Sequence, residues 1–112
     1  MPLMNSISGS CDFEHGICGL LQSVYDDFDF TRQSGQTASR GTGPSTDHTT
    51  GTADGHYIYI ESSYPQRSGD KAEIMTPIYR GSAPKCRMAF AYHMYGSTIG
   101  KLEVSCDILI LH

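Results

Sequence analysis

Apolar and polar residues alternate along several short stretches of the chain, a pattern that is typical of β-strands. Within residues 56–62, Tyr57 and Tyr59 fall on one face of an extended chain, whereas Ile58 and Ile60 fall on the other. No stretch shows the period of a helix. Short strands separated by Gly and Pro turns indicate an all-β fold, an antiparallel sandwich or barrel. Further strands are predicted at 23–33, 72–79, 86–95 and 101–111.

The last two predicted strands are joined by a short turn. Residues 86–95 alternate in polarity, and "GSTIG" at 96–100 is bounded by glycines. The segment 101–111 then follows, so the pattern predicts a β-hairpin. Pro77 places the preceding strand at a sheet edge or a bulge, because proline has no amide hydrogen to donate.

A long polar segment interrupts this pattern. Residues 34–55 contain no Leu, Ile, Val, Phe, Tyr or Met, so they cannot form a core element. We interpret them as a surface loop that crosses one edge of the fold. A loop of this length within a compact domain often has a function when it is ordered.

The composition limits the size and the function of the protein. The 112 residues suffice for one small domain. The net charge of −4 gives no general reason to bind nucleic acid or an anionic membrane. No apolar run reaches the roughly 18 residues that a bilayer-spanning helix needs. The first ten residues, "MPLMNSISGS", lack the pattern of a secretory signal.

The chain has four cysteines, an even number that favours disulfides in an oxidising compartment. Zinc is the alternative, and His15, His48, His56 or His93 could then assist. Structural zinc sites usually gather two close ligand pairs, whereas here only Cys11 and Cys18 are close. The spacing therefore favours disulfides over zinc. The other two cysteines are Cys86 and Cys106.

Several motifs occur together in a recognisable order. They are "CDFEHGICGL", "DDFDFTRQSG", "GTGPSTDHTTGTADGHYIYIESS", "GDKAEIMTPIY" and "CRMAFAYHMYGSTIGKLEV". In this order and spacing the chain strongly resembles the MAM domain, an extracellular module of meprins, neuropilins and mu-type receptor protein tyrosine phosphatases. The resemblance divides the chain into a tail at 1–10, a MAM-like domain at 11–104 and an atypical tail at 105–112.

The resemblance implies a fold and a task. The family fold is a concanavalin-like jelly-roll β-sandwich of two antiparallel sheets, and its task is adhesion to other protein chains, including its own kind. It is not catalytic and does not insert into membranes. We therefore expect an extracellular protein, or the ectodomain of a membrane protein, that contains this module among others. The resemblance also matches Cys11 and Cys18 to the first disulfide of the family.

The resemblance departs from the family at the end of the chain. MAM domains continue further, so we expect C-terminal strands to be missing and the usual partner of Cys86 to be absent. Cys106 is a candidate substitute. If the hairpin centres on Thr98, Cys106 lies across from Phe90, and a bond to Cys86 then requires a register shift or a bent strand.

The resemblance further implies a calcium or sodium ion near one end of the sandwich. Asp12, Glu14 and Asp47 are the acids within the matched motifs, and hard cations bind several oxygens together. The alternative is that Asp47 caps its own turn through the amides of Thr49 or Thr50. A second acidic group, Asp26, Asp27 and Asp29, is interpreted as a solvated strand face paired with Arg32 rather than as a cation site.

Two other functions compete with adhesion. A carbohydrate-binding jelly roll would use Tyr57 and Tyr59, or the long loop, although core packing is the default role of strand tyrosines. A non-catalytic appendage of an enzyme is the other alternative. The sequence has no nucleophile-elbow, HExxH or phosphate-binding glycine motif, so no catalytic residue is predicted.

Overall fold

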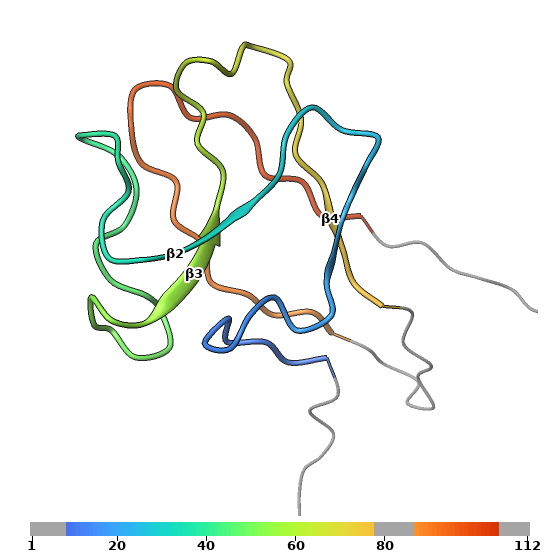
Figure 1. Ribbon diagram of the computed structural model, residues 1–112, viewed down its shortest axis with the longest axis vertical. Helices are drawn as coiled ribbons and strands as arrows, with labels where there is room; N and C mark the ends of the chain where they lie inside the picture. The colour runs from blue at the N-terminus through green and yellow to red at the C-terminus, as the bar shows by residue number, and fades with distance from the viewer. Residues whose placement is uncertain (1–8, 78–86, 106–112) are drawn as a thin grey trace, which may run out of the picture.

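The computed structural model describes residues 9–77 and 87–105, and Figure 1 shows their course. These residues form short strands and no helix, which confirms the predicted all-β class. None of the described residues belongs to a helix that could cross a bilayer. The strands are β1 (Leu21–Gln22), β2 (Thr31–Ser34), β3 (His56–Tyr59) and β4 (Ile74–Met75).

The strands form two antiparallel pairs. β2 pairs with β3 along four residues, from Thr31 opposite Tyr59 to Ser34 opposite His56. β1 pairs with β4, so the chain leaves β1, builds the β2–β3 pair and returns to the side of β1 (Figure 1). In sequence, the β2–β3 pair therefore lies between the two strands of the β1–β4 pair.

The side chain of Gln22 connects the two pairs. Its amide nitrogen donates to the carbonyl of Phe30 at 2.7 Å, and its amide oxygen accepts from the Phe30 N–H at 2.9 Å. Both backbone groups of Phe30 are thus satisfied immediately before β2 begins. The Gln22 side chain thus makes the two hydrogen bonds that a neighbouring strand would otherwise make with the Phe30 backbone.

The acidic segment before β2 differs from its prediction. The ladder begins only at Thr31, and Asp26 and Asp27 do not pair with Arg32. Instead the Asp26 carboxylate accepts from the Glu73 N–H at 2.6 Å, and that of Asp27 from the Lys71 N–H at 2.7 Å. Carboxylates bind backbone amides strongly, so these acids hold the segment that leads into β4.

The predicted hairpin is absent from the described part of the chain. Residues 87–105 contain no strand in the structure, and both sides of this segment are exposed. Its backbone carbonyls accept from other segments: Tyr95 accepts from the hydroxyl of Thr42, and Thr98 from that of Ser62 at 3.1 Å. Phe90 and Tyr92, which are two residues apart, still lie on the same face of this segment, since their rings are 6.3 Å apart.

The described residues enclose no fully apolar core. Among the described residues the buried side chains are those of Ser23 and Asp47, and neither is apolar. All four residues of β3 are half-buried. The apolar side chains that a sandwich would bury are therefore mostly exposed in the described ranges, above all between Met88 and Val104.

Candidate functional site

The first structural element of the site is a closed loop at the amino end. Cys11 and Cys18 form a disulfide, with Cα atoms 5.8 Å apart, within the range of bonded cysteines. Within this loop Phe13 has a φ of 63° and Gly16 a φ of 141°, so the chain turns tightly at both positions. The predicted first disulfide is confirmed. Cys86 and Cys106, the candidate second pair, lie outside the described residues.

Arg32 attaches this loop to β2. Its Nε donates to the carbonyl of Phe13 and its Nη2 to that of Glu14, both at 2.6 Å. The guanidinium presents several N–H donors in a fixed fork, so one side chain holds two successive carbonyls. This role of Arg32 was not predicted from the sequence, because every residue has a backbone carbonyl and no pattern marks the two that Arg32 binds.

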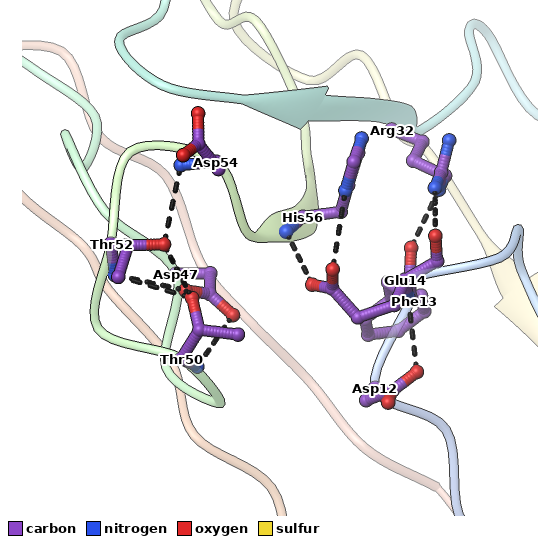
Figure 2. A network of polar contacts seen from close by, with 9 residues as sticks. All are labelled: Asp12, Phe13, Glu14, Arg32, Asp47, Thr50, Thr52, Asp54 and His56. Atoms are coloured by element: carbon purple, nitrogen blue, oxygen red, sulfur yellow. Dashed lines mark hydrogen bonds and ion pairs between the residues drawn. The ribbon is translucent and has the colours of Figure 1, made fainter.

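Glu14 attaches the same loop to β3. Its Oε1 accepts from the His56 N–H at 2.7 Å, and its Oε2 lies 3.6 Å from His56 Nδ1. The Asp12 carboxylate accepts from the N–H of Glu14 at 3.0 Å, which fixes the backbone beside it. Figure 2 shows that Arg32 and His56 approach the loop from the two paired strands.

Asp47 organises the threonine-rich part of the long loop. It is buried, with 5% of its surface exposed. Its carboxylate accepts from the N–H of Thr50 at 2.9 Å, from the Thr50 hydroxyl, and from the N–H of Thr52 at 3.3 Å. Although desolvation by burial raises the pKa of Asp47, the bonds from Thr50 and Thr52 outweigh it and lower the pKa to about 2. The alternative prediction that Asp47 caps its turn at Thr50 is confirmed.

Gly55 connects the capped turn to the start of β3. A Cβ atom on Gly55 would lie 2.1 Å from Cγ of Asp47, so only glycine fits against this carboxylate. The next residue, His56, carries the N–H that binds Glu14. Gly55 packs against the capped turn and His56 binds the disulfide loop, so these two consecutive residues join both segments to β3.

The three acids proposed as cation ligands do not converge. In Figure 2 the Asp47 carboxylate faces its own threonines, whereas Glu14 faces His56 and Asp12 faces the Glu14 backbone. No group of three His, Cys, Asp or Glu side chains suited to a metal occurs in the described residues. The three carboxylates therefore do not form one cluster in the described residues, and binding of calcium or sodium stays a prediction.

Comparison with known proteins identifies the arrangement. The profile of the MAM domain, meprin/A5/mu, matches residues 11–108 and so begins at the disulfide. The chain belongs to the MAM domain family. The resemblance predicted from the sequence is confirmed, and the disulfide, the Glu14 contacts and the Asp47 turn all lie within the matched MAM domain.

Relatives of this MAM domain are long proteins. Human MAM domain-containing glycosylphosphatidylinositol anchor protein 1 is 43% identical over 105 residues, which cover 89% of this chain and 11% of that protein. Mouse MAM domain-containing glycosylphosphatidylinositol anchor protein 2 is 42% identical over 111 residues, with 84% and 11% covered. Human MAM domain-containing protein 2 is 40% identical over 96 residues, with 86% and 14% covered. The chain thus spans about a tenth of the relatives it matches. No solved structure matches it significantly.

Proposed function

We propose that the chain is an extracellular, non-catalytic adhesion module that binds protein chains, including a second copy of itself. Membership of the MAM family supports this proposal. Two of the relatives are named for a glycosylphosphatidylinositol anchor, which is consistent with an extracellular place for this chain. A disulfide at the amino end also suits an oxidising compartment.

An exposed apolar segment is the observation that carries the proposal. We call it the apolar band; it comprises Met88, Phe90, Tyr92, Met94, Tyr95 and Ile99, with exposed fractions between 39% and 70%. Apolar side chains gathered on a surface favour association with another protein. The backbone of residues 87–95 pairs with no strand in the described chain, so a partner strand could add to it.

The carbohydrate alternative gains no support at Tyr57. The Tyr57 hydroxyl donates to the carbonyl of Gly35, and the ring is half-buried 6.0 Å from that of Tyr59. Desolvation by burial and the neighbouring Tyr59 both raise the pKa of Tyr57. Tyr57 thus acts as a structural residue that holds the start of the long loop against β3.

Self-association in solution tests the proposal. We expect sedimentation velocity of the oxidised chain to show a concentration-dependent dimer or larger species. The double variant Phe90→Ser/Tyr92→Ser should weaken this association by about tenfold or more, because it lacks the two neighbouring rings that association removes from water. Tyr64→Ser is the matched control, since Tyr64 is 94% exposed and lies outside the apolar band.

Two results would overturn the proposal. One is a chain that remains monomeric at every concentration tested. The other is a Phe90→Ser/Tyr92→Ser variant that associates as strongly as the native chain.

A further inference from the structure

Two adjoining hollows open where the long loop meets the apolar band. The first is formed by residues 36–45 together with Tyr95, and the second by Arg40 and Gly41 together with residues from 94–99. Each has a volume of about 470 Å³, within the range of about 300–1,000 Å³ that is typical of small-molecule sites. Arg40, Gly41 and Tyr95 line both hollows, so the two adjoin, and we refer to them together as the depression.

Close backbone approaches shape this depression. The hydroxyl of Thr42 donates to the carbonyl of Tyr95, which lies 53 residues further along the chain. A Cβ atom on Gly96 would lie 2.6 Å from the Thr42 hydroxyl, and one on Gly43 would lie 2.5 Å from that of Thr37. Gly96 therefore allows the two segments to meet, and Gly43 allows the long loop to fold closely onto Thr37.

The walls offer groups that recognise a sugar ring. Gln36 and Ser45 supply an amide and a hydroxyl, which can both donate and accept hydrogen bonds. The hydroxyls of Thr37 and Ser39 already donate, to the Thr42 carbonyl at 3.4 Å and to the Glu61 carboxylate at 3.0 Å, so toward a ligand they act as acceptors. Tyr95 adds an aromatic ring, and 63% of this residue is exposed. Several polar groups beside one aromatic surface suit a ligand that has hydroxyls on its edge and C–H groups on its face.

Arg40 gives the depression a positive charge. No described acid forms an ion pair with Arg40, and the acid beside the hollows is Glu61, whose carboxylate accepts from the Ser39 hydroxyl at 3.0 Å. A guanidinium matches a carboxylate through two parallel hydrogen bonds. The Arg40 guanidinium is therefore available to a ligand carboxylate.

We propose that this depression binds a saccharide that carries a carboxylate. Arg40 binds the carboxylate, the Tyr95 ring packs against the sugar face, and the Gln36 amide and Ser45 hydroxyl orient the ring. This inference does not require self-association, although the depression shares Met94, Tyr95 and Ile99 with the apolar band. It places sugar recognition at the long loop and away from Tyr57 and Tyr59.

Isothermal titration of the full 112-residue chain tests the proposal. The probes are N-acetylneuraminic acid and glucuronic acid, compared with galactose as the neutral sugar and with acetate as the carboxylate without a sugar. We expect at least one acidic sugar to bind about tenfold more tightly than both galactose and acetate. Arg40→Ala and Tyr95→Ala should each weaken that binding, and Arg40→Lys should weaken it too because lysine lacks the fork.

Matched variants separate this result from general damage. Arg67→Ala and Tyr64→Ala alter exposed residues outside the depression and should leave binding unchanged. Phe90→Ser/Tyr92→Ser should also leave binding unchanged, so that failure of adhesion and failure of sugar recognition are distinguishable. The proposal is overturned if neither acidic sugar binds, if galactose or acetate binds equally well, or if Arg40→Ala binds like the native chain.

Discussion

We expect the double variant Cys11→Ser/Cys18→Ser to unfold with a free energy about 2–3 kcal/mol below that of the native chain. The disulfide closes a short loop, with seven residues of sequence separation, and its loss releases chain entropy in the unfolded state. Urea unfolding followed by circular dichroism measures the difference. Replacing both cysteines together avoids leaving one unpaired thiol.

The native contacts of the loop extend this effect. Arg32 and Glu14 join the closed loop to β2 and β3, so freeing the loop also loosens the start of β3. A reducing agent should lower the stability of the native chain while leaving the Cys11→Ser/Cys18→Ser variant closer to unchanged. Equal stability of the native chain and the variant under oxidising conditions would contradict this role.

We expect Gly55→Ala to destabilise the chain by about 1–3 kcal/mol, as overpacking of a well-filled site does. The added methyl carbon would lie 2.1 Å from Cγ of Asp47. The carboxylate cannot retreat cheaply, because Thr50 and Thr52 hold it by hydrogen bonds. Thermal unfolding of the two chains measures the loss.

Gly100→Ala is the control for this change. Nothing lies within 4 Å of a Cβ atom on Gly100, and its backbone is outside the left-handed region. This variant should therefore remain within about 0.5 kcal/mol of the native chain. A Gly55→Ala chain as stable as Gly100→Ala would show that Asp47 is not fixed against β3.

Features set by nearby residues could be predicted from the sequence. The alternation around Tyr57 identified β3, and the cluster of small polar residues around Asp47 identified its capped turn. The pairing of Cys11 with Cys18 followed from the family motif and closes within one short segment. Each of these depends on residues that are close in sequence, where local geometry leaves few choices.

Features set by distant residues could not be predicted. β1 is only two residues long and gains its identity from β4, more than fifty residues later. The bonds from Arg32 end on carbonyls, which every residue carries. The segment 86–95 alternates like a strand, yet in its described part the backbone contacts the long loop instead of a neighbouring strand. Alternation reports that a chain can be extended, whereas pairing depends on which partner is present.

Adhesion between surfaces tests the central claim most directly. Beads coated with the oxidised chain are mixed in a buffer free of any glycan, and their clustering is followed by light scattering. We predict that these beads cluster and that beads coated with Phe90→Ser/Tyr92→Ser remain dispersed. Native-coated beads that remain dispersed, at a coating density equal to that of a clustering positive control, would contradict the account.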